Sequence, residues 1–482
     1  MTEFTKQEFS ENIVKIPRKS GQVEKIHEYL YNWGIQHNIK TTKDKSGCIY
    51  YDVPATSGCE KYPSIIFQAH TDMVQTTQDP NYNMNNQPID IVFDEETASY
   101  HSRDYKTNIG ADDAEGIIAM MNLAINKNYK HGSLRLLFTY DEEVTMQGAR
   151  ELSLDVLNSD YLINIDAGPV GATCVSSAGI LKTKLEHQYA NTNQLLNTQL
   201  NIEISNFCGG HSGLDINKKL LSANVVMNEL LKKLIDQDVN FQIESIEGGD
   251  KPNAIANISK ASIFVDEKES NLVKDILTNE FDEQKKGFDK EKNAIIEISE
   301  KKTTATSALS VDDSKKLINM VSEIPHGCRE SDNDVDKSPL VSSNFAMISL
   351  KNGMLDITIH SRSNINGKND EVEAQLQQLA KEYGFTYTVE NKYEGWEDSA
   401  DNKLKALWEQ SSLNACNIKN KEIKAHGGLE ISRFLEKKPD LQMLAIGMDV
   451  AEEHMVTETL YTKSMPAFFA ILLNFLENAN QL

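Results

Sequence analysis

Short apolar runs alternate with helix-like segments in the first third of the chain. The runs are Ser64–Ala69, Leu134–Thr139 and Tyr161–Ile165. Continuous apolar runs of this length are typical of strands that are covered on both faces. Between the first two, Glu115–Asn126 is apolar on nearly every side, which predicts a helix packed against such a sheet. The alternation predicts an α/β fold, with a mixed, largely parallel sheet covered by helices.

The pattern changes after residue 186 and changes back near residue 396. Gln199–Ile204 alternates apolar and polar residues, as a sheet with one solvated face requires, and residues 267–302 are rich in Lys and Glu, which predicts a solvated helix and then a strand. Buried runs return with a predicted strand at Leu441–Gly447 and a predicted helix at Thr462–Leu476. We therefore predict one domain from residues 1–186 and 396–482, with an α+β domain of residues 187–395 inserted into it.

Composition limits the partners of the chain. Its 482 residues include 49 Lys plus Arg and 72 Asp plus Glu, so the formal net charge is −23. This charge argues against nucleic acids and anionic membranes as partners, because both bind through Lys and Arg. The longest apolar run, Ala467–Leu473, is much shorter than the roughly 20 residues of a membrane-spanning helix. Six scattered cysteines and a polar N-terminal segment predict a reduced, cytoplasmic protein.

Carboxylates and imidazoles follow several of the predicted strands. In an open α/β sheet, ligands bind beyond the carboxyl ends of the strands, so these residues are candidates for a site. The segments are His70-Thr71-Asp72, Asp141-Glu142-Glu143 and Asp166 after the first three strands, Gly110-Ala111-Asp112-Asp113 before the buried helix, and Asp449 and His454 after the late strand.

Each of these segments taken alone has a structural explanation, because a carboxylate after a strand is usually a turn former or a helix cap. Together they gather negative charge at one edge of the sheet, and a cation would relieve the repulsion. Two histidines with several carboxylates and no cysteine favour zinc or manganese. The set is large enough for two metal ions bridged by one carboxylate.

The ordered motifs resemble those of a known family. His70-Thr71-Asp72, Gly110-Ala111-Asp112-Asp113, Asp141-Glu142-Glu143, Asp166-Ala167-Gly168, Gly209-Gly210-His211-Ser212-Gly213 and His426-Gly427-Gly428-Leu429-Glu430 occur here in this order. The chain thereby resembles the aminoacyl-histidine dipeptidases, also called Xaa-His or cytosolic non-specific dipeptidases. They are a branch of the dinuclear zinc metallopeptidases. The resemblance runs from about residue 10 to the end and implies a metallopeptidase catalytic domain with an inserted lid domain.

The resemblance implies a role for each residue of the metal site. His70, Asp112, Glu143, Asp166 and His454 correspond to the metal ligands, with Asp112 bridging two divalent ions. Zinc is the expected metal, with manganese or cobalt as the other candidates. Asp72 corresponds to the aspartate that orients His70, and Glu142 to the general base.

The resemblance also implies substrate-binding residues. His211 corresponds to a donor to the oxyanion, and Asn253 and Arg362 to residues that hold the peptide or its carboxylate. His426 and Gly428 belong to a loop near the metals whose glycines would let the backbone approach the substrate, and Glu430 in it is either a contact for the substrate amine or a structural carboxylate. The chain departs from the family pattern at Asp113, Pro252 and Met455.

These motifs predict a dipeptidase that uses metal-activated water on dipeptides of the Xaa-His type or of broad range. Its expected partner is a small peptide, and a homodimer is a further expectation from the resemblance. An amidohydrolase acting on N-acyl amino acids with the same metals is the alternative enzyme. A catalytically inactive, metal-binding relative is the alternative from another class, although the ligands and Glu142 are all present. The chain lacks Gly-x-Gly-x-x-Gly and phosphate-loop motifs, which disfavours a nucleotide-dependent enzyme.

Overall fold

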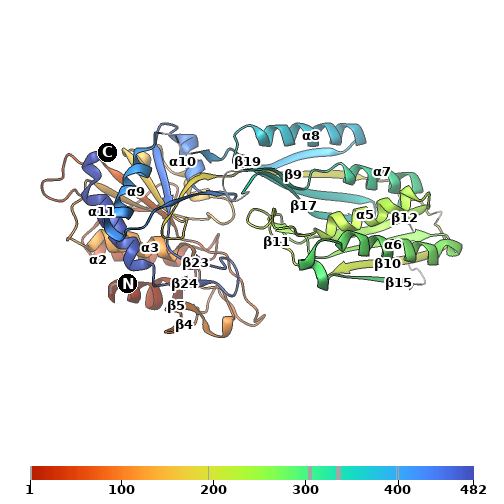
Figure 1. The fold of residues 1–482 in the computed structure, drawn as a ribbon, viewed down its shortest axis with the longest axis horizontal. Helices are drawn as coiled ribbons and strands as arrows, with labels where there is room; N and C mark the ends of the chain where they lie inside the picture. Colours follow the sequence, from red (N-terminus) through yellow and green to blue (C-terminus); the bar gives the residue numbers. More distant parts are fainter. Residues whose placement is uncertain (1–2, 194, 302–306, 333–337, 398, 400) are drawn as a thin grey trace. The chain divides into compact units, whose positions relative to one another are not determined.

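The computed structural model describes residues 3–193, 195–301, 307–332, 338–397, 399 and 401–482. The chain forms two compact units (Figure 1). The first comprises Met1–Ser177, Trp396–Ala425 and Leu429–Leu482, and the second comprises Ala178–Gly395 and His426–Gly428. The sequence predicts domain boundaries at 186/187 and 395/396. These boundaries refer to domains that fold independently, so they stay a prediction.

A nine-stranded mixed sheet forms the centre of the first unit. Its order is β1 (Lys40–Lys43), β2 (Ile49–Val53), β6 (Leu134–Thr139), β3 (Ile65–His70), β7 (Tyr161–Ile165), β22 (Gln442–Ile446), β8 (Ala172–Ser177) and β20 (Trp396–Glu397), and β21 (Lys421–Ala425) also pairs with β8. The central strands β6, β3, β7 and β22 pair in parallel, whereas β1, β2 and β20 join their neighbours antiparallel. The sheet places β22, from the C-terminal segment, between two strands of the N-terminal segment.

Helices pack around this sheet. They are α1 (Glu3–Gln7), α2 (Glu24–Gln36), α3 (Ala111–Ile125), α4 (Gln147–Glu151), α9 (Lys403–Cys416), α10 (Ile431–Lys437) and α11 (Met465–Glu477), with short helices at Glu8–Asn12, Ile13–Lys15, Arg103–Tyr105, Leu154–Leu157 and Ala479–Gln481. Helix α3 contacts β3, β6 and β7 and is buried along most of its length, so it belongs to the core of the unit. A small antiparallel sheet has the order β23 (Val450–Ala451), β24 (Thr459–Tyr461), β5 (Ser99–Ser102), β4 (Ile91–Asp94).

The second unit contains a nine-stranded antiparallel sheet. Its order is β15 (Ile295–Lys301), β10 (Thr198–Ser205), β14 (Ser259–Val265), β12 (Phe241–Gly248), β17 (Pro339–Lys351), β18 (Met354–Ser363), β9 (Gly179–Gln188) and β19 (Thr386–Tyr393), with β16 (Gly327–Ser331) beside β17. Helices α5 (Ala223–Asp236), α6 (Ser270–Lys285), α7 (Val311–Ser322) and α8 (Lys368–Tyr383) pack on it, and short helices lie at Glu267–Glu269 and Asp289–Asn293. Strand β11 (Gly210–His211) pairs with β13 (Ala254–Ile255).

The predicted α/β architecture is confirmed, and among the described strands parallel pairing occurs in the first sheet, between the central strands β6, β3, β7 and β22 and between β21 and β8. The three early apolar runs form β3, β6 and β7, and β10 has the alternating burial that its sequence indicates. The helix and strand expected in residues 267–302 appear as α6 and β15, and Lys302 lies outside the described residues. Within the described ranges, no helix has the length and hydrophobicity to cross a bilayer.

Candidate metal centre

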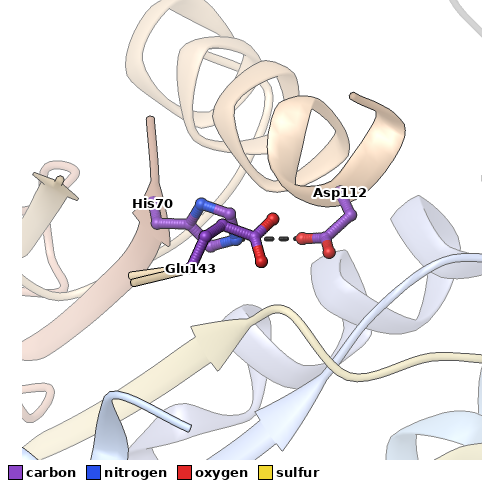
Figure 2. A group of neighbouring side chains, drawn as sticks. All are labelled: His70, Asp112 and Glu143. Atoms are coloured by element: carbon purple, nitrogen blue, oxygen red, sulfur yellow. Dashed lines mark hydrogen bonds and ion pairs between the residues drawn. The ribbon is translucent and has the colours of Figure 1, made fainter. Parts of the chain in front are cut away.

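The predicted metal ligands of the first unit come from five different places in the fold and meet at the carboxyl ends of the parallel strands. His70 is the last residue of β3, Glu143 and Asp166 follow β6 and β7, Asp112 lies in the first turn of α3, and His454 lies between β23 and β24. Figure 2 shows His70, Asp112 and Glu143 turned toward one another. These three residues offer ligand atoms that all lie within 4.8 Å of one another.

The carboxylate of Asp112 lies between two imidazoles. Its Oδ1 is 2.9 Å from Nε2 of His70, and its Oδ2 is 3.1 Å from Nε2 of His454. Oδ1 of Asp166 lies 3.8 Å from the same nitrogen of His70, and Oε2 of Glu143 lies 2.9 Å from that of His454. The five side chains therefore form two sets, each with one imidazole and one terminal carboxylate, and Asp112 belongs to both.

The electrostatics of the cluster favour bound cations. Hydrogen bonds and charge from Glu143 and Asp112 outweigh the effect of burial and raise the pKa of His454 to about 12. Burial of Asp112 opposes its ionisation, but its contacts with His454 and His70 are stronger and lower its pKa. Positive charge is thus strongly stabilised at this position. Imidazole nitrogens and carboxylate oxygens are ligands that suit zinc and manganese, so the residues present fit such ions.

Asp113 is adjacent to Asp112, the predicted bridging residue, and its hydrogen bonds indicate a structural role. Its Oδ2 accepts a hydrogen bond from the backbone N–H of His70 at 2.9 Å, and its Oδ1 accepts one from Gly116 at 3.0 Å. The side chain is fully buried, and these bonds tie the start of α3 to the end of β3. Asp113, a departure from the family pattern, therefore fixes the backbone beside the ligands.

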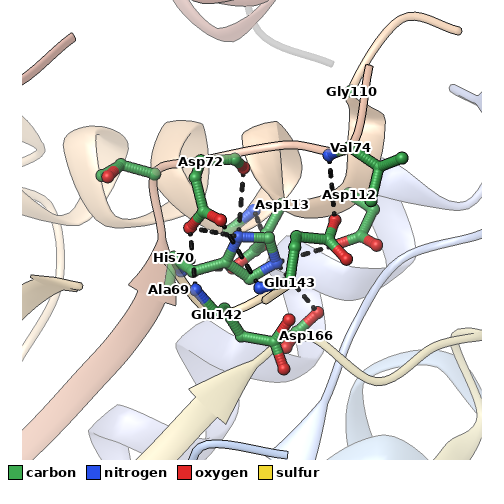
Figure 3. Close-up of polar contacts among 12 residues, drawn as sticks. Ala69, His70, Asp72, Val74, Gly110, Asp112, Asp113, Glu142, Glu143 and Asp166 are labelled. Carbon is green, nitrogen blue, oxygen red and sulfur yellow. Dashed lines mark hydrogen bonds and ion pairs between the residues drawn. The ribbon is translucent and has the colours of Figure 1, made fainter. Parts of the chain in front are cut away.

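Asp72 connects a ligand to the proposed base. Its Oδ1 lies 3.5 Å from Nδ1 of His70 and accepts a hydrogen bond from the backbone N–H of Glu142 at 3.0 Å. Its Oδ2 accepts from the hydroxyl of Ser20 at 2.7 Å and from the N–H of Glu143 at 3.4 Å. Figure 3 shows that the side chains of Glu142 and Glu143 point in different directions from the backbone that Asp72 holds. Asp72 thus sets the orientation of His70 and the position of the Glu142–Glu143 backbone together.

The Glu142 carboxyl has the environment expected of a base. Burial raises its pKa well above the usual range, and the charges of Asp166, Glu143 and Glu430 act in the same direction. No hydrogen bond within the described part of the chain binds its carboxylate oxygens. A carboxyl with a raised pKa is better suited to accept and return a proton near neutral pH.

Two buried charges that sequence reasoning missed hold the loop before Asp112. The guanidinium of Arg18, fully buried, donates to the carbonyl oxygens of Thr71, Asp72 and Gly110. The carboxylate of Glu458, 1% exposed, accepts from the N–H groups of Ile109 at 2.8 Å, Gly110 at 2.7 Å and Asp112 at 3.2 Å. Opposite charges thus hold the two sides of one peptide segment.

The close approach of Arg18 requires glycine at position 110. Gly110 has a φ of 63°, and a Cβ atom there would lie 2.6 Å from Nη2 of Arg18. Arg18 and Glu458 are single polar residues without a periodic pattern around them. Only their long-range contacts reveal their role.

Glu430 is a structural carboxylate. Its Oε2 accepts hydrogen bonds from Gln68 on β3 at 2.7 Å and from the hydroxyl of Thr139 on β6 at 2.5 Å, and the residue is fully buried. Burial raises its pKa to about 7. Of the two alternatives that the sequence leaves open, the structure supports the structural one.

The second unit contains the predicted substrate-binding residues. His211 on β11 faces Ala254 across the small sheet, and the N–H of Ser212 donates to the carbonyl of Asn253 at 2.8 Å, so the His211 and Asn253 segments lie side by side. Nδ1 of His211 accepts from the N–H of Leu214 at 3.2 Å. The neutral imidazole therefore has its proton on Nε2.

Arg362 on β18 is a buried cation, 4% exposed. Its guanidinium contacts the hydroxyl of Ser212 at 3.4 and 3.5 Å, and no carboxylate among the described residues pairs with it. Burial lowers its pKa to about 10, and the charge effect of Tyr393 opposes this, so the group stays charged at neutral pH. A buried cation that lacks an anionic partner is suited to bind an anion.

Both ring nitrogens of His426 are hydrogen-bonded inside the second unit. Nε2 lies 2.7 Å from the hydroxyl of Ser342, and Nδ1 lies 2.6 Å from Oδ1 of Asn364. Burial lowers the pKa of His426 to about 3, and the charge of Arg362 adds to the effect. His426 is thus a neutral, fully bonded residue that supports its loop, and Gly428 lies half-buried two residues later.

Pro252, another departure from the family pattern, accepts hydrogen bonds from His360 and Asn344 through its carbonyl oxygen.

The chain matches known proteins along nearly all its length. Residues 66–478 match the model of the peptidase family M20/M25/M40. The chain belongs to this family. It is therefore a hydrolase of the metallopeptidase class, and the dipeptidase resemblance of its motifs is confirmed.

Individual relatives agree with the family assignment. The chain is 27% identical over 475 residues to the cytosol non-specific dipeptidase of Escherichia coli K12, covering 96% of this chain and 95% of that protein. Its fold is similar to that of the aminoacylhistidine dipeptidase of Vibrio alginolyticus, with a TM-score of 0.81, 23% identity and coverage of 99% and 97%. It is also similar to the aminopeptidase PepT of Bacillus cereus, with a TM-score of 0.56, 16% identity and coverage of 99% and 98%.

The contacts of Arg18 and Glu458 predict that both residues strengthen metal binding. Arg18→Lys and Glu458→Gln are each expected to weaken zinc binding by about 10–100-fold, as loss of an outer partner of a metal site typically does. Titration calorimetry of the metal-free protein measures the effect. Arg135→Lys is the control, because Arg135 donates to the carbonyl of Val156 away from the ligands. Unchanged zinc affinity in both variants would contradict the prediction.

The buried His426 predicts acid sensitivity of the second unit. Its pKa is about 3 in the folded protein against about 6.5 in an unfolded chain, so between these values only the unfolded state binds the proton. Its contribution to stability is complete above pH 6.5 and is lost as the pH falls, by about 1.4 kcal/mol per pH unit. Urea unfolding between pH 7 and pH 5 should show a smaller pH slope in His426→Gln than in the parent protein. Equal slopes would refute the assignment.

Proposed function

We propose that the protein is a dinuclear-metal dipeptidase. The proposal rests on the position of Asp112. Its Oδ1 faces His70, which belongs to one ligand set, and its Oδ2 faces His454, which belongs to the other. The proposed base, Glu142, stands beside these sets without belonging to either. The similarity to a cytosol non-specific dipeptidase over 96% of the chain supports a dipeptide as substrate.

The residues of the first unit divide the work of hydrolysis. Two metal ions, when bound, lower the pKa of a water molecule and polarise the scissile carbonyl. His70, Asp112, Asp166, Glu143 and His454 would hold them. Glu142 takes a proton from the water as its oxygen bonds to the carbonyl carbon, and then gives that proton to the nitrogen of the leaving amine as the C–N bond breaks. Asp72 keeps the Glu142 backbone and the His70 imidazole in fixed positions during both proton transfers.

Residues of the second unit suit the other charges of the reaction. Arg362 is buried, and no carboxylate of the described ranges pairs with it, so we propose that its guanidinium binds the terminal carboxylate of the peptide. His211, with its proton on Nε2, is proposed to donate to the oxyanion that forms on the carbonyl oxygen. Asn253, exposed beside His211, is proposed to bind the peptide backbone, and His426 and Gly428 to hold the neighbouring loop.

The remaining assignments are finer proposals. We propose zinc as the metal because of the mixed imidazole and carboxylate ligands, with manganese or cobalt as substitutes. We also propose the cytoplasm as the site of action, in agreement with the name of the Escherichia coli relative. The homodimer stays a prediction. The cytosol non-specific dipeptidase of Escherichia coli matches 96% of the chain, and this disfavours the amidohydrolase alternative.

Glu142→Gln tests the reaction class and the base together. Metal-dependent cleavage of dipeptides such as Ala-His and β-Ala-His is expected of the parent protein, and the variant should lose about 10²–10⁴-fold in kcat, because the amide cannot accept the proton. Its zinc content should be unchanged. Glu151→Gln, half-exposed on α4, is the matched control and should keep the parent activity. Cleavage of only an N-acetyl amino acid would instead support an amidohydrolase.

The anion-binding role of Arg362 is tested by removing either charge. Arg362→Met should raise KM for a dipeptide about 10–100-fold, which corresponds to about 1.5–3 kcal/mol for a charged hydrogen bond. KM for the same dipeptide with an amidated C-terminus should already be high and should change little in the variant. Arg329→Met, at an exposed position of the same unit, is the control. An equal rise for both substrates would exclude carboxylate recognition by Arg362.

A further inference from the structure

The segment that carries His211 has little regular structure to hold it. Between β10 and α5 the chain forms only the two-residue strand β11, followed by turns. Gly209 and Gly210 have φ values of 63° and 151°, a backbone conformation that glycine adopts readily. Such a segment has many accessible conformations, so an imidazole on it needs other contacts to keep a fixed direction.

One buried carboxylate closes this segment at both ends. Glu291, in the short helix Asp289–Asn293, is 0% exposed. Its Oε2 accepts a hydrogen bond from the backbone N–H of Cys208 at 2.9 Å, and its Oε1 accepts one from the N–H of Leu221 at 3.0 Å. Cys208 and Leu221 lie on either side of His211 in the sequence. The Sγ atom of Cys208 also donates to the carbonyl of Lys290, next to Glu291.

Hydrogen bonds within the segment transmit this constraint to the imidazole. The N–H of His211 donates to Oδ2 of Asp215 at 2.7 Å, and the N–H of Asp215 donates back to the carbonyl of His211 at 2.9 Å. The N–H of Leu214 then fixes Nδ1 of the ring. These bonds hold the backbone of residues 211–215 in one conformation around the ring.

The hydrogen bonds that Glu291 accepts offset part of the cost of burying its carboxyl group. No cation among the described residues forms an ion pair with it; its oxygens accept from the backbone N–H groups of Cys208 and Leu221, and the Cys208 thiol lies close to the same carboxyl. Burying a carboxylate is expensive, and hydrogen bonds to the ionised form recover part of that cost. An apolar residue would fill the same space more cheaply but would leave both N–H groups without an acceptor.

We propose that Glu291 is a positioning residue for catalysis: it clamps the two ends of the 208–221 segment and thereby fixes the direction of Nε2 of His211. The proposal rests on the role of His211 as donor to the oxyanion. Glu291 touches no reacting atom and acts only through the segment. Small displacements of such a donor are costly, because a misplacement of about 1 Å far from the chemistry can lower the rate by about 10²-fold.

The decisive experiment is a double-mutant cycle with Glu291→Gln and His211→Ala in the full chain. Glu291→Gln loses one acceptor oxygen and is expected to lower kcat on a dipeptide about 10–100-fold, with KM changed less than about twofold. His211→Ala is expected to lower kcat about 10²–10³-fold. The double variant should have the kcat of His211→Ala, because once the imidazole is removed Glu291 has no donor left to position.

Three further measurements distinguish positioning from a general loss of structure. Zinc affinity of Glu291→Gln should equal that of the parent, because the predicted ligands belong to the other unit. Nitrogen-15 NMR of labelled histidine should show a changed signal for His211 alone. Glu280→Gln, a carboxylate on α6 that accepts from Gln284 and Lys233, is the matched control and should keep the parent kcat.

The possible failures are separable. A parent-like kcat in Glu291→Gln together with an impaired His211→Ala overturns the positioning role alone. Independent, multiplicative losses in the double variant also overturn it, because Glu291 would then act by another route. A parent-like kcat in His211→Ala overturns the proposed oxyanion donor and the positioning role with it. If Glu291→Gln fails to fold, Glu291→Asp, which keeps the charge but is too short to reach both ends, takes its place in the same cycle.

Discussion

The carboxylate of Asp112 is shared between His70 and His454, and this shared contact constrains the first unit around it. Glu143 and Asp166 bring further negative charge to the same edge, so their mutual repulsion must be balanced by imidazolium groups or by bound cations. The fold keeps these groups close by attaching them to buried strands and to backbone that is itself hydrogen-bonded. Arg18 and Glu458 hold the approach to Asp112 from opposite sides, and Asp113 ties α3 to β3.

The two units have opposite chemical characters. The first gathers carboxylates around two histidines, whereas the second places hydrogen-bond donors near His211 and contains the guanidinium of Arg362, for which the described residues provide no carboxylate partner. A dipeptide has complementary features: a carbonyl to be polarised, an oxyanion to be stabilised during reaction and a terminal carboxylate. The predicted metal ligands and the predicted substrate-binding residues thus belong to different units of the chain.

Sequence patterns predicted what depends on local periodicity. Strands β3, β6 and β7 were predictable because each is a short apolar run, and His70, Glu143 and Asp166 were predictable as candidates because they directly follow those runs. The site roles themselves came from the ordered motifs. Arg18, Glu458 and Glu291 were not predictable, because each is an isolated polar residue whose partners lie far away in the sequence. The shared position of Asp112 also needed the structure, since no pattern states which carboxylate lies between two imidazoles.

The position of β22 has a consequence for how the protein folds during its synthesis. This strand separates β7 from β8, although both of those are synthesised before the second unit begins. At about 5–20 residues per second, β7 waits for tens of seconds with its hydrogen-bonding edge unpaired. Meanwhile, nearly all of the second unit has emerged and can fold first. An unpaired strand edge of this kind is a template for pairing with other chains. The nascent first unit therefore needs chaperones most before β22 is synthesised.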